Sequence, residues 1–290
     1  MSLPDSVFLS DVVQHAAKRF AEVGIDSAQV DAELLAGHVL GLSRGGVQSA
    51  MISGQQLSEN ENETINNFYA RRLKREPLQH ITGIAYFRNL ELEVGRGVFT
   101  PRPETEFVAQ LAIDALRSYA NQSPIGVDLG TGSGAIALAM ATEVSNSKIF
   151  AVEKSPEALV FTTRNFQTYA QANGHLIQGD LKDAFIELND LVSVVASNPP
   201  YIPQDAVPKD IEVKLHDPDL ALYGGEDGMQ VMHFVSATAK RLLHTGGTLV
   251  VEHADSQAHQ VCQLLLADGW RQVRSHKDLT GRDRAVTAIK

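Results

Sequence analysis

The sequence predicts an α/β protein in which a doubly wound, Rossmann-like domain follows a small helical domain and a β-hairpin connector. From Ile125 onward, short apolar runs alternate with helical patterns, which is typical of a parallel sheet with helices on both faces. Roughly the first 75 residues show helical spacing without a strand pattern, and a segment of alternating polarity follows them. We expect these three parts to span residues 1–85, 86–100 and 101–290.

The predicted helical domain contains three amphipathic segments. The apolar face of the first segment is formed by Leu9, Val12, Val13, Ala16 and Phe20. Ser27 is placed to cap a second helix, which Gly41 would end. Ser58 and Glu61 have capping-box spacing before a third helix. The basic residues of that third segment, Arg71, Arg72, Lys74 and Arg75, are expected on a solvated face.

The remaining elements follow from apolar runs and from glycine and proline signals. Residues 87–99 predict a hairpin with its turn at Gly95–Gly97, and the prolines of TPRPETE delay the next helix to about Glu104–Tyr119. Strands are expected at Gly126–Leu129, Lys148–Val152, Leu176–Ile177, Leu191–Ala196, Thr248–Glu252, Trp270–Val273 and Ala285–Ile289. Helices are expected at Ala135–Thr142, from Ser155-Pro156, at Met229–Leu243 and at Ser256–Ala267.

Composition is that of an ordinary globular protein and narrows the possible partners. Hydrophobic residues make up 43% and charged residues 21% of the 290 positions. The single cysteine, Cys262, excludes an internal disulfide or a thiolate metal cluster, which fits a reducing cytoplasm. No signal peptide and no membrane span are expected from the apolar patterns. The formal net charge of -10 argues against sequence-independent binding to nucleic acid.

The segment Asp128–Gly134, DLGTGSG, joins the first predicted strand of the sheet to its helix. Its glycines permit a tight turn and let a ligand approach bare backbone. Glu153 stands about twenty residues further on, where a carboxylate can accept hydrogen bonds from both hydroxyls of an adenosine ribose. The pattern Gly130-x-Gly132-x-x-Ala135 also satisfies the relaxed dinucleotide fingerprint. The turn alone therefore leaves a dinucleotide and S-adenosylmethionine open.

The segment Ser197–Tyr201, SNPPY, ends a predicted buried strand with two prolines. Proline cannot continue a central strand because it has no N–H, and each proline keeps the residue before it out of helical geometry. The chain should leave the sheet as a stiff, extended segment at the carboxyl edge, where open α/β sheets bind ligands. We expect the backbone carbonyls of Asn198 and Pro199 to face this cleft without a sheet or helix partner.

Asn198 adds a side-chain carbonyl, and two acceptors at a fixed spacing match the two N–H bonds of a planar amino group. Tyr201 offers a flat face for an amide or a base. Such nitrogens are poor nucleophiles, because their lone pair is delocalised, and acceptors that hold both hydrogens stabilise the developing charge. Positioning this nitrogen beside a sulfonium methyl group could supply roughly 7–11 kcal/mol. The segment therefore favours S-adenosylmethionine at the glycine turn.

With these motifs the sequence resembles the HemK/PrmC family of protein-(glutamine-N5) methyltransferases. The similar segments are REPLQHITG (75–83), FTPRPETE (99–106), DLGTGSGAIALA (128–139), AVEKSPEAL (151–159), SNPPYIP (197–203), LALYGGEDGM (220–229) and VVEH (250–253). FTPRPETE together with NPPY is specific to that family, whereas NPPY alone is not.

The resemblance implies methylation of the glutamine amide in the Gly-Gly-Gln motif of class-1 peptide-chain release factors, with S-adenosyl-L-methionine as donor and S-adenosyl-L-homocysteine as product. The residues that would bind the cofactor are Gly130, Thr131, Gly132, Ser133, Gly134, Glu153, Asp180, Leu181 and Asn198. Glu153 would hold the ribose, and Asp180 and Leu181 would lie by the adenine, although family members often have an aromatic residue in place of Leu181. The catalytic and substrate-binding residues would be Asn198, Pro199, Pro200 and Tyr201.

The resemblance also implies roles for other segments. Phe99–Arg102 would help close the cofactor pocket, and the helical domain would dock the release factor with the hairpin as a hinge. Apart from the resemblance, we expect a cytoplasmic monomer that binds no nucleic acid, membrane or metal.

Other functions stay open. A methyltransferase acting on N6 of adenine or N4 of cytosine in nucleic acid would use the same clamp, but the acidic balance and the lack of a large basic domain argue against it. A nicotinamide oxidoreductase or an inactive binding protein on the same fold is also possible. His253 and His259 lie near acidic residues, but we expect solvent positions for them, because no third metal ligand has suitable spacing.

Overall fold

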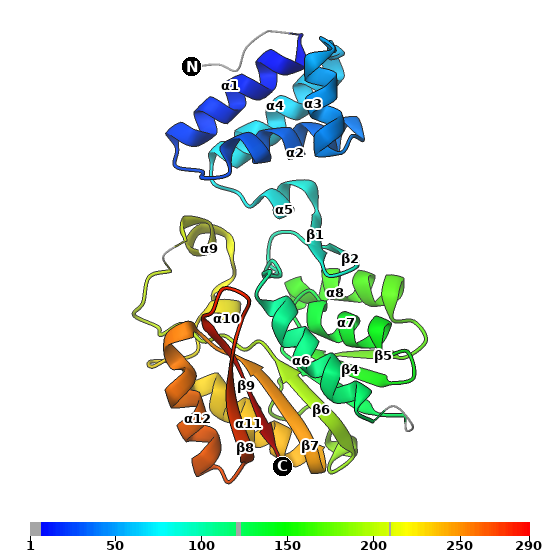
Figure 1. The fold of residues 1–290 in the computed structure, drawn as a ribbon, viewed down its shortest axis with the longest axis vertical. Helices are drawn as coiled ribbons and strands as arrows, with labels where there is room; N and C mark the ends of the chain where they lie inside the picture. Colours follow the sequence, from blue (N-terminus) through cyan, green and yellow to red (C-terminus); the bar gives the residue numbers. More distant parts are fainter. Residues whose placement is uncertain (1–6, 120–122, 209) are drawn as a thin grey trace. The chain divides into compact units, whose positions relative to one another are not determined.

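The computed structural model describes residues 7–119, 123–208 and 210–290. The chain divides into two compact units, Met1–Gly83 with Lys209–His216, and Ile84–Pro208 with Asp217–Lys290. Figure 1 shows that the first unit is helical and that the second contains a sheet between helices. The predicted fold class is therefore confirmed, and the first unit ends two residues before the expected boundary.

The first unit is a cluster of helices around a small apolar core. Its helices are α1 (Leu9–Glu22), α2 (Ala28–Leu40), α3 (Arg44–Ile52), α4 (Glu59–Leu73), α5 (Leu78–Thr82) and α9 (Ile211–His216). The apolar face of α1 is buried, and Phe20 packs edge-on against Tyr69 of α4. The capping box at Ser58 and Glu61 and the end of α2 at Gly41 are confirmed. The prediction missed α3, which contains two glycines, and the five-residue α5.

One basic residue of α4 is buried, so the expected solvated face for this run is wrong at that position. Arg72 is 3% exposed, and its guanidinium pairs with Asp31 at 2.8 Å and with Glu212 at 2.7 Å. Arg75 also pairs with Glu212, at 3.2 Å. Because a buried charge needs a partner, these ion pairs attach α9 to the helical unit. The basic run alone could not show which of its members faces inward.

The hairpin of the second unit consists of β1 (Ile84–Phe87) and β2 (Leu90–Glu93). Its turn is Arg88–Asn89, so the predicted turn at Gly95–Gly97 is wrong. Arg88 has a φ of 53°, which is unusual for a residue with a side chain. Its guanidinium pairs with Glu143 at 2.5 Å, and its backbone N–H donates to Glu106 at 2.9 Å. These charge-assisted bonds offset the strain of the turn.

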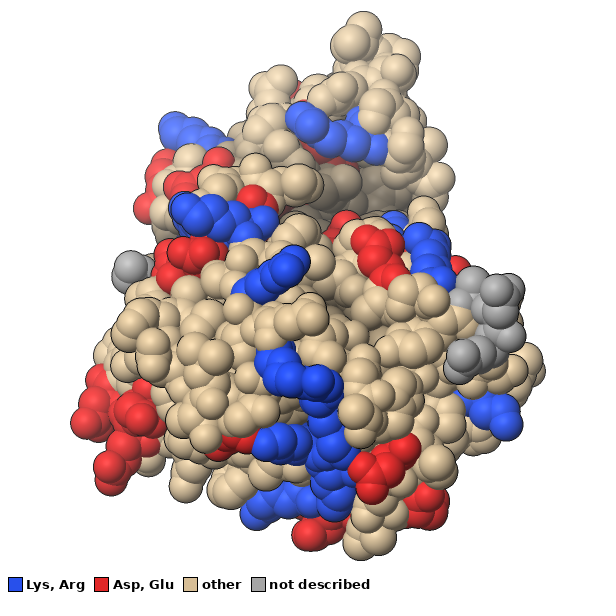
Figure 2. All heavy atoms as spheres, turned by 60° about the horizontal axis from the view of Figure 1, so that its bottom comes forward, with Lys and Arg blue, Asp and Glu red and all other residues tan. Residues whose placement is uncertain are grey.

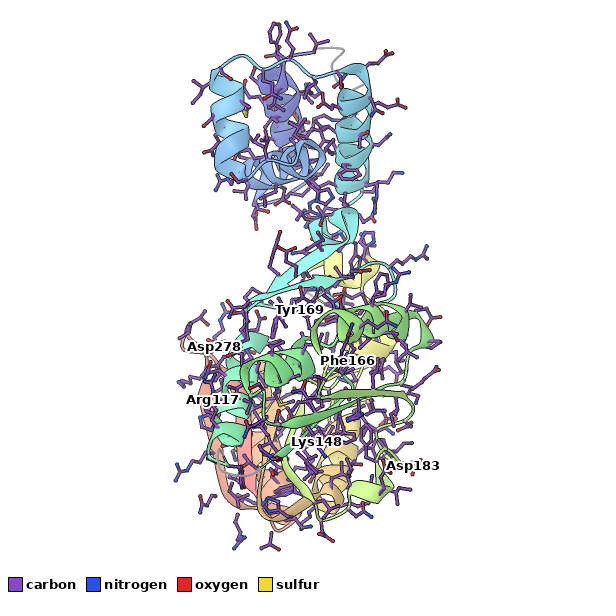
Figure 3. The ribbon with its side chains drawn as sticks, turned by 90° about the vertical axis from the view of Figure 1, so that its right-hand side faces the viewer. Arg117, Lys148, Phe166, Tyr169, Asp183 and Asp278 are labelled. Atoms are coloured by element: carbon purple, nitrogen blue, oxygen red, sulfur yellow. The ribbon has the colours of Figure 1, made fainter. Side chains whose placement is uncertain are left out.

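The two glycines after β2 allow close packing against α8 (Pro156–Tyr169) instead of forming a turn. A Cβ at Gly95 would lie 2.7 Å from the Phe161 ring, and one at Gly97 would lie 2.8 Å from Glu157 Cβ. Tyr169, labelled in Figure 3, exchanges hydrogen bonds of 3.1 and 3.0 Å with the backbone of Glu91. The expected connector, residues 86–100, thus groups with the second unit, and its role as a hinge stays a prediction.

The second unit is built on a seven-stranded sheet of order β5-β4-β3-β6-β7-β9-β8. Its strands are β3 (Ile125–Leu129), β4 (Lys148–Glu153), β5 (Gly174–Gln178), β6 (Val192–Ser197), β7 (Leu243–Glu252), β8 (Arg271–Lys277) and β9 (Asp283–Ile289). Strands β3 to β7 are parallel, whereas β9 lies antiparallel between β7 and β8. The unit's other helices are α6 (Thr105–Arg117), α7 (Ala135–Glu143), η1 (Ile186–Leu188), α10 (Asp219–Leu222), α11 (Gln230–Leu242), η2 (Asp255–Gln257) and α12 (Ala258–Ala267).

Helices cover both faces of this sheet (Figure 1). An apolar core lies between the sheet and the helices on each face. Val194 and Ala196 of β6 join the core beneath α6 and α7, whereas Val195 between them joins the core beneath α11. Burial on both faces explains why the run before SNPPY is unbroken and apolar. Within the described ranges, no helix has the length and apolar character needed to cross a bilayer.

Candidate active site

The carboxyl ends of two neighbouring strands bring the glycine turn and SNPPY together. Strands β3 and β6 pair in parallel, so Gly130 and Asn198 follow them at one edge of the sheet. Ser197 is fully buried, and its Oγ donates to the Leu129 carbonyl at 2.6 Å, which joins the two strand ends. Strands β4 and β5 lie on the other side of β3, so the strand order reverses here. This is where open α/β sheets bind ligands.

One side of the glycine turn is hydrogen-bonded to β4, and the other side is open. Gly130, Gly132 and Gly134 have φ values of 76°, 57° and 90°, which favour glycine. The N–H groups of Gly130 and Thr131 donate to the Val152 carbonyl at 3.1 and 3.0 Å. A Cβ added at Gly130 or Gly132 would meet nothing within 4 Å. The space beside these two glycines fits the expected approach of a ligand to backbone.

Two polar residues of α8 support the turn, and the sequence analysis missed both. Thr162 donates to the Gly132 carbonyl, and Asn165 Nδ2 donates to the Ser133 carbonyl at 2.9 Å. Both side chains are buried, at 0% and 1% exposure. The sequence did contain a signal for them, because the two polar residues lie three positions apart on the apolar face of a helix. Buried polar groups need hydrogen-bond partners, so such a pair indicates a contact with another segment.

Glu153 lies at the tip of β4, as predicted, and contacts the turn directly. The residue is 7% exposed. Its Oε2 accepts from Gly132 N at 2.8 Å, and its Oε1 accepts from Ser155 N at 2.7 Å. A carboxylate has about four acceptor positions, so each oxygen retains capacity for a further donor.

Asp128 is a buried acid beneath the turn that was not among the predicted site residues. Its Oδ2 accepts from Thr131 Oγ1 at 2.6 Å and from Ala137 N at 3.1 Å. Its Oδ1 has no hydrogen-bond partner among the residues that the structure describes. Burial raises the pKa of Asp128 to about 7, against the lowering effect of these two donors. The carboxyl thus ties the strand end, the turn and the start of α7 together.

Asp180 and Leu181 follow β5, next to the end of β4. The Gly179 N–H donates to the Glu153 carbonyl at 2.9 Å, which brings this loop to the same edge. Burial acts to raise the pKa of Asp180, but the Lys182 N–H and the Lys154 ammonium outweigh it and hold the pKa below its usual range. Leu181 is partly buried against the core beneath α11. Their predicted place beside an adenine stays a prediction.

The SNPPY segment leaves the sheet as the sequence predicts. Within the described part of the chain, no donor forms a hydrogen bond with the carbonyl of Asn198 or Pro199. Asn198 Nδ2 donates to Thr105 Oγ1 at 3.3 Å. Two residues on from Pro199, the Tyr201 carbonyl accepts from Gln257 Nε2 at 2.9 Å. The first two carbonyls therefore keep acceptor capacity, while Gln257 holds the end of the segment.

Glycines of LALYGGEDGM pack against this segment, which explains a motif without a predicted role. A Cβ at Gly224 would lie 2.5 Å from the Pro200 carbonyl oxygen, and one at Gly228 would lie 2.2 Å from the Tyr201 carbonyl oxygen. Gly228 also has a φ of 75°. Any larger residue would displace the backbone of SNPPY.

Buried ionisable groups lie behind SNPPY at the end of β7. Glu252 is 1% exposed, and burial raises its pKa to about 7, although the hydroxyls of Thr105 and Tyr201 act on it to lower the pKa. Burial likewise raises the pKa of Tyr201. His253 is fully buried, so its predicted solvent position is wrong. Its Nδ1 donates to the Ala254 carbonyl at 2.7 Å, and burial lowers its pKa.

The Phe99–Arg102 segment is held by contacts within the second unit. The Arg102 guanidinium lies 5.0 Å from the centre of the Phe99 ring and pairs with Asp217 at 2.8 Å. These contacts fix the start of the segment that leads into Thr105. Its predicted role in closing a cofactor pocket stays a prediction.

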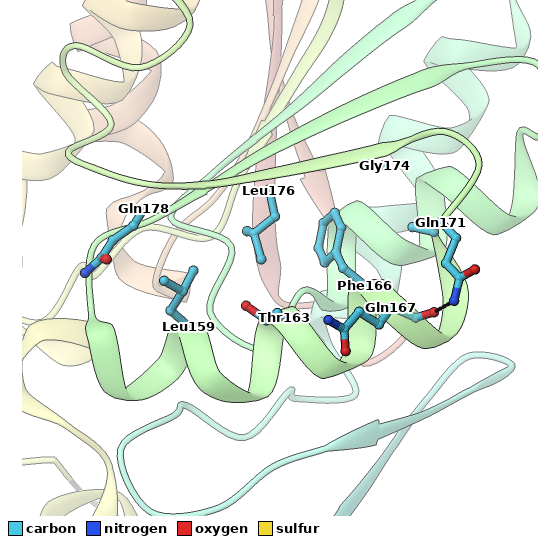
Figure 4. A pocket seen from close by; sticks show the side chains of 9 residues that line it. Leu159, Thr163, Phe166, Gln167, Gln171, Gly174, Leu176 and Gln178 are labelled. Atoms are coloured by element: carbon cyan, nitrogen blue, oxygen red, sulfur yellow. Dashed lines mark hydrogen bonds between the residues drawn. The ribbon is translucent and has the colours of Figure 1, made fainter.

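A depression of about 370 Å³ lies at the edge of the sheet between α8 and β5 (Figure 4). Its lining includes Phe166, Leu176 and Gln178, contains no ionisable side chain, and shares no residue with the predicted site. This depression therefore offers no acid–base chemistry. In residues 7–119, 123–208 and 210–290, no group of three or more His, Cys, Asp or Glu residues could hold a metal ion.

Known protein families match both units. The family described as the PrmC N-terminal domain matches residues 11–83, and the methyltransferase small domain matches residues 89–217. A relative from Streptomyces coelicolor named release factor glutamine methyltransferase is 46% identical over 290 residues, which cover 98% of this chain and 99% of the relative. Further relatives with 35–40% identity carry the same name.

One further relative and one solved structure are also similar to this chain. A relative from Streptomyces pristinaespiralis named 4-amino-L-phenylalanine/4-methylamino-L-phenylalanine methyltransferase is 35% identical over 289 residues, covering 97% of this chain and 95% of the relative. The crystal structure of a methyltransferase from Pyrococcus furiosus superposes with a TM-score of 0.51 at 19% identity, covering 77% of this chain and 98% of that one. The structural likeness shows the shared fold.

Proposed function

Because this chain belongs to the release factor glutamine methyltransferase family, we propose that it methylates the side-chain amide nitrogen, N5, of a glutamine in a protein substrate. The donor is S-adenosyl-L-methionine, the product is S-adenosyl-L-homocysteine, and the glutamine is that of the Gly-Gly-Gln motif of class-1 peptide-chain release factors. The names of the relatives and the match to the methyltransferase small domain support this assignment.

The open side of the glycine turn supports the proposed place of the donor. Gly130–Gly134 line its methionine end, and Glu153 holds its ribose through the acceptor capacity that remains on both oxygens. Asp180 and Leu181 contact the adenine. Thr162 and Asn165 keep the turn in shape by binding its carbonyls. When bound, the donor supplies an electrophilic methyl group on a sulfonium.

SNPPY supplies the acceptors for the amide that is methylated. The Asn198 side-chain oxygen and the Pro199 carbonyl each accept one hydrogen of the glutamine NH₂ group, and Pro200 and Tyr201 shape the wall beside it. This grip directs the nitrogen lone pair toward the methyl group and stabilises positive charge as the nitrogen bond forms. The proton leaves after methyl transfer, when the nitrogen has become acidic, so no strong base is needed.

The single observation that carries this proposal is the adjacency of β3 and β6, by which two SNPPY carbonyls without a donor among the described residues lie beside the open glycine turn. A clamp for a flat amino group next to a nucleoside-binding turn fits transfer to nitrogen. It does not by itself choose among amides, bases and arylamines.

The test offers radiolabelled donor with three acceptors: a release factor carrying Gly-Gly-Gln, duplex DNA and 4-aminophenylalanine. We expect label in the release factor alone. Asn198→Ala should lower the single-turnover rate by about 10²-fold or more, with cofactor affinity changed less than about tenfold. Asn189→Ala, an exposed site before the amino end of β6, is the control and should retain the rate. An unchanged rate for Asn198→Ala would refute the clamp.

The competing nucleic-acid methyltransferase is not favoured. The names of the relatives point to protein and amino-acid substrates, and the net charge is -10. On the face shown in Figure 2, Lys and Arg form a narrow band with acidic residues on both sides, not a broad basic surface.

The proposal also gives the helical unit a role and the chain a location. The helical unit docks the release factor, and a single chain acts alone in the cytoplasm, where translation takes place. Support for the docking role comes from the match of residues 11–83 to the PrmC N-terminal domain.

A further inference from the structure

An asparagine clamp works in only one orientation of its amide. The two ends of the Asn198 amide are an acceptor, Oδ1, and a double donor, Nδ2. If Oδ1 faces the substrate amide, it accepts a hydrogen from the NH₂ group. If the amide is flipped by about 180°, two donors face each other and the grip is lost. The site therefore needs a neighbour that distinguishes the two ends.

Thr105 is the neighbour in contact with the Nδ2 end. It is the first residue of α6, is 4% exposed, and receives the 3.3 Å hydrogen bond from Asn198 Nδ2. Its backbone is fixed as well, because Thr105 N donates to the Arg102 carbonyl at 3.0 Å. A hydroxyl can donate or accept, so it selects the Nδ2 end only when its own proton is committed elsewhere.

Glu252 can receive that proton. Its side chain is 1% exposed, and the hydroxyls of Thr105 and Tyr201 both act on its carboxyl group. An ionised carboxylate can only accept, and Oε2 still lacks a partner among the described residues. A Thr105 hydroxyl that donates toward Glu252 presents its lone pairs to Asn198. Burial raises the pKa of Glu252 to about 7, although Arg284, which is 8% exposed, acts to lower it, so the carboxylate form that only accepts prevails above that pH.

We propose that Thr105 and Glu252 are positioning residues that orient the Asn198 amide, so that Oδ1 faces the substrate nitrogen. The first bond runs from Asn198 Nδ2 to Thr105 Oγ1, and the proposed second bond runs from the Thr105 hydroxyl to Glu252. This inference rests on the proposed function, because only a substrate with an NH₂ group requires that orientation. It gives the threonine of FTPRPETE and the glutamate of VVEH a shared role at the clamp.

Two variants of Thr105 test the role of the hydroxyl. Thr105→Val keeps the shape and removes the hydroxyl, whereas Thr105→Ser restores it. Thr238→Val is the matched control, since Thr238 is also helical and buried, at 3% exposure, and its Oγ1 lies 3.5 Å from the Lys182 carbonyl. Glu252→Gln keeps the shape but can donate to Thr105 and reverse the bond direction.

The first measurement is hydrogen exchange of the Asn198 Nδ2 protons in the free chain, with the signal identified by its loss in Asn198→Asp. Exchange should be at least tenfold faster in Thr105→Val than in Thr105→Ser or Thr238→Val. The second measurement is methylation of the release factor. Thr105→Val and Glu252→Gln should each lower kcat at least tenfold with cofactor Kd changed less than threefold, and Thr105→Ser should recover most of the loss.

The outcomes separate the two proposals. If Thr105→Val matches Thr238→Val in exchange and in kcat, the positioning role is wrong while the proposed function stands. If the unaltered chain methylates no release factor, the proposed function is wrong, and the exchange rates still decide whether Thr105 orients the amide.

Discussion

Replacing Gly228 by alanine tests whether LALYGGEDGM holds SNPPY in place. Gly228 has a φ of 75°, and an added Cβ would lie 2.2 Å from the Tyr201 carbonyl oxygen and 2.9 Å from Gln257 Nε2. The left-handed backbone costs alanine about 1–2 kcal/mol, and overpacking adds about 1–3 kcal/mol. We therefore expect Gly228→Ala to lower the free energy of unfolding by about 2–5 kcal/mol.

Gly281→Ala is the matched control for the backbone contribution. Gly281 has a φ of 82°, and a Cβ there would meet nothing within 4 Å, so only the cost of about 1–2 kcal/mol applies. Urea unfolding of both variants can be followed through Trp270. This single tryptophan is 3% exposed and lies in the second unit, so its fluorescence reports the unit that contains both glycines.

Gly228→Ala should also affect turnover, because the Tyr201 carbonyl must move by about 1 Å to relieve the contact, and displacements of this size can lower a rate by about 10²-fold. We expect kcat of Gly228→Ala to fall by about that factor relative to Gly281→Ala, at a temperature where both are folded. Equal stability and equal kcat in the two variants would show that the glycine contact does not hold SNPPY.

Three further results are expected. Glu153→Ala should weaken S-adenosyl-L-methionine binding by about 1–3 kcal/mol through lost charge-assisted bonds, and calorimetry showing no change would remove Glu153 from the site. A Gly-Gly-Glu peptide should not be methylated, because its carboxylate offers no hydrogen to the acceptors, and a methyl ester seen by mass spectrometry would contradict the clamp. Since burial raises the pKa of Asp128 from 3.8 to about 7, its contribution to stability is present below pH 4 and lost as the pH rises through 7. Asp128→Asn should reduce this pH dependence by about 2–4 kcal/mol in Trp270-monitored unfolding, and an unchanged slope would contradict the assignment.

Sequence signals predicted the structure correctly where residues close together in the chain determine it. The capping box at Ser58 and the proline at the start of α8 depend on neighbours within one turn, so their positions could be predicted. The unbroken apolar run before SNPPY likewise predicted a central strand, because burial on both faces removes the polar alternation. The positions of Gly130 and Asn198 at one sheet edge followed from the parallel order of the strands.

Sequence signals failed where the deciding partner is distant in the chain. The hairpin turns at Arg88 because Glu143, far along the sequence, pairs with that side chain. Arg72 is buried because Asp31 and Glu212 neutralise it. His253 is buried although the sequence around it contains acidic residues typical of the surface.

By itself the sequence determined the order of elements, the two ligand-facing motifs and the chemistry of a clamp for a flat nitrogen. The tertiary structure decided which side chains hold that clamp, because Thr105, Gly228, Glu252 and Gln257 reach SNPPY only after the sheet has formed. Periodicity records which side of an element is apolar. It carries no information about which buried donor meets which acceptor, since that pairing depends on distances set by the packing of separate elements.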